Sequence, residues 1–227
     1  MTQDKNYHEA DKPLHLWREG DMILNFGLKR IINPLTPLMK EWMEAPYPNF
    51  NEAEQYLFDH AFQKAEASLV GWSEEDLKMK LISPVLDLGY LLEDSQGIVS
   101  LFDKLISSEV DNIPLSVRTD FMIATGVLDA FRKPFFHFQE YKPQKNPSGD
   151  SMAQLLMAFL IAQQINQDKQ PLYGAEIIRK TWTFVVMEGR EYCVSKAFVS
   201  TDRDDLLSII GILRKFRELL FSRFLKD

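Results

Sequence analysis

Three side chains on two neighbouring segments could form a metal-dependent hydrolytic centre. Asp120 lies in VRTDFMIAT, and Glu140 and Lys142 follow about twenty residues later in FFHFQEYKPQ. If both segments are strands, side-chain alternation places Glu140 and Lys142 on one face. An Asp and a Glu from adjacent strands can share one Mg²⁺, which prefers hard oxygen ligands. A lysine beside them can orient the attacking water or stabilise charge on a phosphate, so the set suits phosphodiester hydrolysis.

The same three residues also have an ordinary interpretation. A Glu-x-Lys on a strand arises often by chance, and charged side chains at strand ends commonly form solvated rims or cross-strand ion pairs. Without further context, the residue types alone leave a catalytic and a structural role open.

The elements that must position these residues are short apolar segments after residue 97, most of them bounded by Gly, Pro, Asn or Asp. Such segments are typical of strands. A helix rich in Ala, Leu, Met and Gln interrupts them, over about Asp150 to Gln167. We expect six strands, at Ile98–Ile106, Leu115–Thr125, Pro134–Lys142, Pro171–Ile178, Thr181–Met187 and Tyr192–Phe198.

The first third of the chain has helical periodicity instead. Apolar residues predict a helix from about His15 to Ile32, which Pro34 and Pro37 should stop. Asn51 with Glu54, and Ser73 with Asp76, look like helix starts, with helices running to about Val70 and to near Gly89. A closing helix is expected over about Asp202 to Phe224, and residues 1–13 should form a loose tail.

Together these elements predict an α/β fold in which a mixed sheet is flanked by helices. Residues 1–70 would form a helical N-terminal extension, and residues 71–227 would form the α/β domain with its C-terminal helix. The whole chain of 227 residues is long enough to bury a sizeable core.

The charge distribution bears on the kind of partner. The chain carries 33 acidic and 26 basic residues, a formal net charge of −7. The excess lies in residues 1–110, which carry −9, whereas residues 111–200 and 201–227 carry +1 each. A net acidic protein is a poor candidate for nucleic-acid binding, but this distribution leaves the β-rich half able to face a polyanion.

Other classes of site are excluded or weakly supported. The single cysteine, Cys193, rules out an internal disulfide framework, and the four histidines show no metal-ligand spacing. The longest apolar run, Leu155 to Ala162, is too short for a membrane span, and no signal-peptide pattern starts the sequence, so we expect a cytoplasmic protein. Neither glycine-rich phosphate loop motif occurs, so we expect no nucleotide cofactor.

The order of these elements resembles the PD-(D/E)XK nuclease superfamily: an Asp, then Glu-x-Lys on the next strand, then a helix with an early Gln. The segment PLYGAEIIRKTWTFVVMEGREYCVS looks like the strand pair that follows this helix in the nuclease domains of type I restriction enzymes. The segment WSEEDLKMKLISPVLDLGY is similar to their first core helix. The resemblance covers about residues 72–200. Arg118-Thr119 precede Asp120, so the proline of the family motif is absent.

The resemblance implies a restriction-endonuclease-like fold and assigns roles to this sequence. Asp120 and Glu140 would ligate Mg²⁺ or Mn²⁺, and Lys142 would position the attacking water. Gln154 would lie near the site at the start of its helix. An acid from the first core helix, either Glu74 or Glu75, would complete the set, and periodicity does not separate the two.

These additional residues have structural alternatives as well. Acids such as Glu74 and Glu75 suit the first turn of any helix, because they interact favourably with its dipole. Gln154 also suits the surface of a half-exposed helix.

The resemblance therefore implies a divalent-metal-dependent nuclease acting on DNA. The alternative is a catalytically silent domain of the same fold that binds nucleic acid or a protein partner. Residues 1–70 lie outside the resemblance. Their helices, or the amphipathic closing helix, could dock a protein partner or a second copy of the chain.

Overall fold

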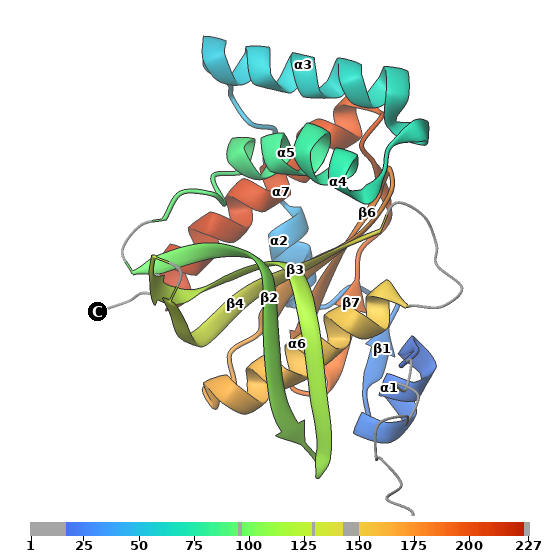
Figure 1. Cartoon of the computed structure of the whole chain (residues 1–227), viewed down its shortest axis with the longest axis vertical. Coiled ribbons are helices and arrows are strands. Elements are labelled where there is room, and N and C mark those ends of the chain that lie inside the picture. Colours follow the sequence, from blue (N-terminus) through green and yellow to red (C-terminus); the bar gives the residue numbers. More distant parts are fainter. Residues whose placement is uncertain (1–16, 95–96, 129, 143–149, 225–227) are drawn as a thin grey trace, which may run out of the picture.

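The structure, a computed structural model, describes residues 17–94, 97–128, 130–142 and 150–224, and the tail predicted over residues 1–13 lies outside these ranges. The described residues form one eight-stranded mixed sheet in the order β1-β7-β6-β5-β4-β3-β2, with β8 beside β6 (Figure 1). The β1–β7 and β4–β5 pairs are parallel, and the other pairs are antiparallel. The strands are β1 (Lys29–Ile31), β2 (Ile98–Val110), β3 (Ile113–Val127), β4 (Ala130–Lys142), β5 (Leu172–Ile178), β6 (Thr181–Glu188), β7 (Glu191–Val194) and β8 (Phe198–Val199).

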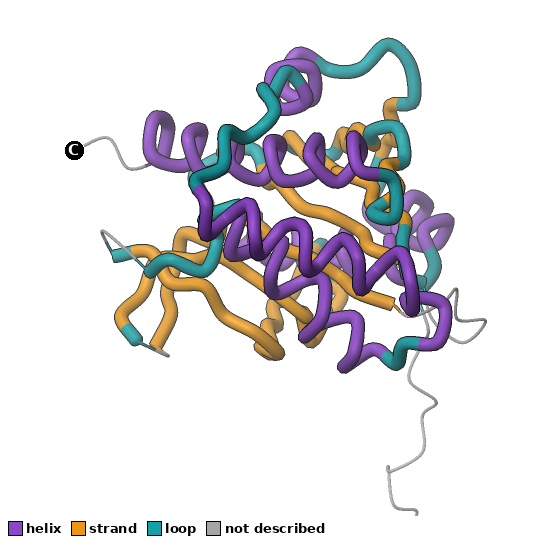
Figure 2. Tube along the Cα trace, turned by 90° about the horizontal axis from the view of Figure 1, so that it is seen from above, coloured by secondary structure: helices purple, strands orange, loops and turns teal. Residues whose placement is uncertain are grey.

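Helices cover both faces of this sheet (Figures 1 and 2). One core lies between the sheet and α6 with α1, and the other lies between the sheet and the helices α2, α3, α5 and α7. The prediction of a mixed α/β sheet flanked by helices, with a C-terminal helix, is confirmed. The helices are α1 (Glu19–Phe26), α2 (Pro37–Met43), α3 (Glu52–Ser68), η1 (Leu69–Gly71), α4 (Glu74–Leu77), η2 (Lys78–Ile82, a π-helical turn), α5 (Ser83–Leu88), α6 (Ser151–Asn166), α7 (Arg203–Leu219) and η3 (Leu220–Phe224).

Helix α3 begins where the sequence predicts, at a reciprocal cap. The side chain of Asn51 accepts a hydrogen bond from the Glu54 N–H, and the Glu54 carboxylate accepts one from the Asn51 N–H. Ser73 and Asp76 make the same exchange at the start of α4. These caps satisfy N–H groups that a helix leaves unpaired at its first turn, which is why the sequence pattern was a reliable start signal.

The helix predicted from His15 to Ile32 is wrong in its second half. Helix α1 ends at Phe26, where Gly27 takes a left-handed conformation with φ 61°. Residues Lys29–Ile31 then pair with β7 as a parallel edge strand. Pairing with a partner far along the chain thus overrides the local helical periodicity.

Pro37 was expected to stop a helix, but it begins one. It is the first residue of α2, where its missing N–H costs nothing, and the Thr36 hydroxyl caps this helix by accepting from the Met39 N–H. This short helix contributes the buried Trp42, whose indole N–H donates to the Ile212 carbonyl at 2.8 Å.

The strand predicted from Tyr192 to Phe198 is two strands. Ser195 falls between β7 and β8. Its N–H donates to the Phe184 carbonyl at 2.9 Å, and its hydroxyl accepts the Phe184 N–H at 2.9 Å. The β6 pairing shifts by one residue across this point, from Val185↔Val194 to Thr181↔Val199. A serine side chain that replaces a backbone acceptor makes this bulge.

The β2–β3 hairpin extends well beyond its predicted strands, to a two-residue turn at Asp111 and Asn112. Both residues have positive φ, 51° and 63°, as a tight hairpin turn of this type requires, and Asp and Asn tolerate that conformation. Asp120 lies midway along the β3 strand of this hairpin.

The division predicted at residue 70 stays a prediction. Residues before it contribute β1 to the sheet and the buried Trp42 and Phe58 to the core on the α7 side. None of the helices in the described ranges is both long and apolar enough to cross a membrane.

Candidate functional site

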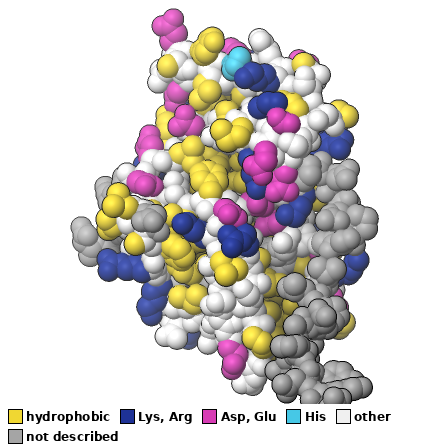
Figure 3. Space-filling view, in the orientation of Figure 1, with side chains coloured by type: hydrophobic (Ala, Val, Ile, Leu, Met, Phe, Trp, Pro, Cys, Tyr) yellow, Lys and Arg dark blue, Asp and Glu magenta, His cyan; other side chains and the backbone are white. Residues whose placement is uncertain are grey.

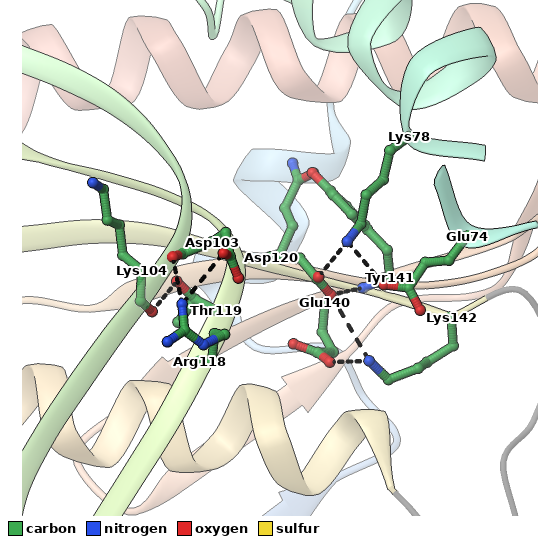
Figure 4. A network of polar contacts seen from close by, with 11 residues as sticks. Glu74, Lys78, Asp103, Lys104, Arg118, Thr119, Asp120, Glu140, Tyr141 and Lys142 are labelled. Carbon is green, nitrogen blue, oxygen red and sulfur yellow. Dashed lines mark hydrogen bonds and ion pairs between the residues drawn. The ribbon is translucent and has the colours of Figure 1, made fainter. Parts of the chain in front are cut away.

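The base of the β3–β4 hairpin brings the two acids predicted from the sequence together. The strands pair in the register Phe121↔Gln139, and continuing it by one residue places Asp120 opposite Glu140. Both side chains line one cavity of about 720 Å³ (Figure 4). The structure contains the predicted pair of strands, and Glu140 and Lys142 lie on one face of β4.

Lys142 lies between the two carboxylates. Its Nζ donates to Glu140 Oε1 at 2.5 Å and lies 3.9 Å from Asp120 Oδ2. The Lys142 side chain is 20% exposed and that of Glu140 is 4% exposed, so this ion pair is largely removed from water. The ammonium is therefore held where the two acidic strands meet.

A second lysine fixes Asp120 from the opposite side. Lys78 Nζ lies 2.9 Å from Asp120 Oδ1 and 2.8 Å from Glu74 Oε1. Lys78 starts the π-helical turn η2, four residues after Glu74, so both side chains point from one helical face towards the sheet (Figure 4). Both candidate acids, Glu74 and Glu75, line the cavity. Only Glu74 pairs with Lys78 and so joins this network, and Glu75 is exposed.

The backbone of β4 completes the environment of Asp120. The Tyr141 N–H donates to Asp120 Oδ2 at 2.8 Å, so each carboxylate oxygen of Asp120 has its own donor. Such contacts hold the carboxylate in one orientation, which a site needs if the geometry is to be ready before a ligand arrives.

Burial gives these groups unusual acid–base behaviour. Burial, with repulsion from Asp120, raises the pKa of Glu140 to about 8, although Lys142 opposes the shift. Burial disfavours the charged form of Lys142, but Glu140 and Asp120 outweigh it and raise its pKa. The pKa of Lys78 is raised in the same way, because Glu74 and Asp120 overcome the effect of burial. Perturbed groups gathered in a cleft are typical of functional sites.

Helix α6 packs closely against the sheet because of a glycine beneath it. A Cβ at Gly174 would lie 2.7 Å from the Phe138 carbonyl and 2.8 Å from the Phe159 ring, so only glycine fits here. Asp150 caps the helix by accepting the Ala153 N–H. Gln154, in the first turn, lines the same cavity as Glu140.

The neighbouring strand carries a contrasting buried acid. Glu176 on β5 is in register with Glu140 on β4, and burial raises its pKa too. Its oxygens are satisfied by neutral hydroxyls: Ser151 donates at 2.5 Å and Thr183 at 3.3 Å. Glu176 does not line the cavity, and it provides a natural control for Glu140.

Asp120 and Glu140 are two carboxylates, the kind of donor that ligates a divalent cation. Within the described ranges, no group of three or more His, Cys, Asp or Glu side chains is arranged to hold a metal ion. Mg²⁺ commonly binds through one or two carboxylates and keeps several waters, so a two-carboxylate site meets its requirement. Acids outnumber lysines around the buried Glu140, so the carboxylates repel one another, and a bound cation would reduce this repulsion.

Six residues that line this cavity were not predicted as site residues: Lys78, Met79, Ser83, Phe102, Asp103 and Arg118. Lys78 could have been found, because a lysine four residues after an acid in a helix is a recognisable pair. Phe102 and Asp103 on β2 carry no such signal, since only the β2–β3 pairing brings them to the cavity. Figure 3 shows acidic, basic and apolar side chains meeting in the middle of this face of the molecule.

No protein-family model matches the chain, and no curated protein matches it significantly. The case for function therefore depends on the fold and the cavity.

Proposed function

We propose that the protein is a Mg²⁺- or Mn²⁺-dependent nuclease that hydrolyses phosphodiester bonds in DNA, with a centre of the PD-(D/E)XK type. The observation that carries this proposal is the meeting of Asp120 and Glu140 around the Lys142 ammonium in one cavity. The order of the elements also supports it, because β4, which carries Lys142, is followed by α6, which carries Gln154.

In this proposal Asp120 and Glu140 hold the metal ion. A bound divalent ion supplies Lewis acidity towards a phosphate oxygen and offsets its negative charge. Lys142 provides a fixed positive charge near the reacting phosphate and orients the attacking water. Lys78 and the Tyr141 N–H keep Asp120 in position, and Glu74 acts through Lys78.

Cleavage of plasmid and oligonucleotide DNA by the purified protein tests the proposal. We expect cleavage that requires Mg²⁺ or Mn²⁺, stops in EDTA and is lost in Lys142→Ala and Asp120→Asn. Glu176→Gln is the matched control, because it alters a buried acid one strand away and outside the cavity. Cleavage that survives both site substitutions, or that falls equally in the control, would contradict the assignment.

One observation favours a second candidate, a silent domain of the same fold that binds a nucleic acid or protein partner. Lys78 and Lys142 already form ion pairs with Glu74, Asp120 and Glu140, so two of these three acidic charges are offset within the protein without a metal ion. Calorimetric titration with Mn²⁺ separates the two candidates. The nuclease proposal expects binding that weakens in Asp120→Asn, and the silent domain expects no binding in either protein.

A further inference from the structure

The cavity has an outer part that the proposed chemistry does not use. Phe102 from β2 and Met79 from η2 line it beside the charged centre, and both are exposed, at 44% and 71%. Asp103 and Arg118, which form an ion pair on the β2–β3 hairpin, line the same cavity (Figure 4). Exposed apolar side chains at the mouth of a charged cleft indicate a ligand with an apolar part.

The ring of Phe102 is supported from behind. It is paired across the β2–β3 ladder with Phe121, which is fully buried, and the two ring centroids are 5.0 Å apart. One side of Phe102 therefore rests on the core and the other is open to the cavity. A ring held in this way can receive a flat ligand at little cost in conformational entropy.

A cation lines the same cavity as this ring. The Arg118 guanidinium donates from Nη1 to the Asp103 carbonyl at 3.0 Å and lies 3.3 Å from its carboxylate. Asp103 lies between Phe102 and Lys104, which pair with Phe121 and Thr119, and it has a positive φ of 54°. Strained residues of this kind cluster at functional sites, because a surrounding structure must hold them in place.

We infer that this outer part binds an unpaired nucleotide of the substrate, with the base stacked on Phe102 and a flanking phosphate near Arg118. This inference deepens the proposed function by naming its substrate class, single-stranded or locally unpaired DNA. A base inside a duplex is stacked on both faces and is not available to an isolated ring. Aromatic stacking on successive bases is the usual way in which proteins hold single strands.

The balance of charge sets the conditions of the test. The cavity is lined by five acids and three basic residues, so an oligonucleotide should bind only with a divalent cation present. We would therefore measure binding in Ca²⁺, with a gel to check that the oligonucleotide stays intact. The probes are oligothymidylate carrying one 2-aminopurine, the same strand in a duplex, and a strand of the same length that is abasic at every position.

We expect the single strand to bind more tightly than the duplex, with quenching of the 2-aminopurine by stacking. Phe102→Ala should weaken binding by about ten-fold and abolish the quenching, whereas Phe102→Tyr should keep both. Leu105→Ala is the matched control, since Leu105 is an exposed apolar residue of the same strand outside the cavity. The unaltered protein should bind the abasic strand as weakly as Phe102→Ala binds the 2-aminopurine strand.

Equal affinity for duplex and single strand, no binding of any probe, or equal binding of the abasic strand would overturn the inference. The abasic result is decisive even if Phe102→Ala fails to fold. Failure of the proposed function is distinguishable. If Phe102 governs strand binding but cleavage survives Lys142→Ala, the hydrolytic assignment is wrong and the stacking site stands. If Phe102→Ala cleaves duplex DNA normally, the stacking site is wrong and the hydrolytic assignment stands.

Discussion

The two faces of β4 use polar residues in opposite ways. On the face towards α6, Glu140 and Lys142 are charged, lie at the end of the strand and line an open cavity. On the other face, Tyr141 donates to Gln139, and the Gln139 amide meets His137, all three of them fully or almost fully buried. The first face carries charged groups that a ligand can reach, and the second carries neutral hydrogen bonds that aromatic rings shield from water.

The contrast teaches that burial alone does not define a functional site. Burial lowers the pKa of His137 to about 3, and it raises the pKa of Glu140 to about 8. Both groups are strongly perturbed, but only Glu140 faces other charges and a cavity. His137 faces Trp42, Phe121 and Phe216 in the core, so its perturbation belongs to stability. The predictions below test this division.

The largest expected effect is on the charged face. Glu140→Gln should lower cleavage by at least about 100-fold, because it removes a ligand charge where the reaction needs it. Its free energy of unfolding should change little, since the substitution also removes repulsion from Asp120. Steady-state cleavage and urea unfolding measure the two effects. A large loss of stability with normal activity would place Glu140 in the structural class instead.

The next effect belongs to His137 and appears as a dependence of stability on pH. Its pKa is about 3 when folded and near 6.5 in the unfolded chain, so the unfolded state binds more protons between these values. Stability should therefore be lost as the pH falls from about 6.5 towards 3, by about 3 kcal/mol between pH 7 and pH 4. His137→Phe should flatten this part of the profile in urea unfolding. An unchanged acid limb in His137→Phe would show that other groups control it.

A smaller effect should separate residues that are neighbours in the chain. Tyr141→Phe removes the hydroxyl that donates to Gln139 Oε1 and should destabilise the protein by about 1–2 kcal/mol. Cleavage per folded molecule should stay normal, because Asp120 is held by the Tyr141 backbone N–H, which remains. Loss of activity without loss of stability would mean that the two faces are coupled.

The smallest effect concerns the orientation of Asp120. Lys78→Met keeps the side-chain stem but removes the bridge between Glu74 and Asp120, and should lower cleavage by about ten-fold. Lys80→Met is its control, since Lys80 lies on the same turn and pairs with Asp76 outside the cavity. Isothermal titration with Mn²⁺ should show weaker binding for Lys78→Met only. Equal behaviour of the two variants would remove Lys78 from the site.

Much of the site's framework followed from local rules. A period of two residues placed Glu140 and Lys142 on one face, and about twenty residues between Asp120 and Glu140 allowed a hairpin. Reciprocal caps at Asn51 and Ser73 located two helix starts. These features depend on neighbours in the chain, so the sequence carries their signals directly.

The remaining features depend on contacts between distant segments. The edge strand β1 forms because Lys29–Ile31 finds β7, and nothing within those three residues announces it. The choice between Glu74 and Glu75 was also open, because both occupy the first turn of α4. The direction in which this helix meets the sheet, with Lys78 reaching Asp120, separates them.

The sequence by itself determined the alternation of strands, the caps, and a pair of acids with a lysine at a spacing suited to a metal centre. Only the tertiary structure decided that these charges share one open cavity, that Lys78 joins them, and that Phe102, packed against the buried Phe121, lines the same cavity. The physical reason is that periodicity and capping are properties of a few consecutive residues. Burial, ion-pair geometry and the opening of a cavity arise where strands and helices from separate parts of the chain pack together.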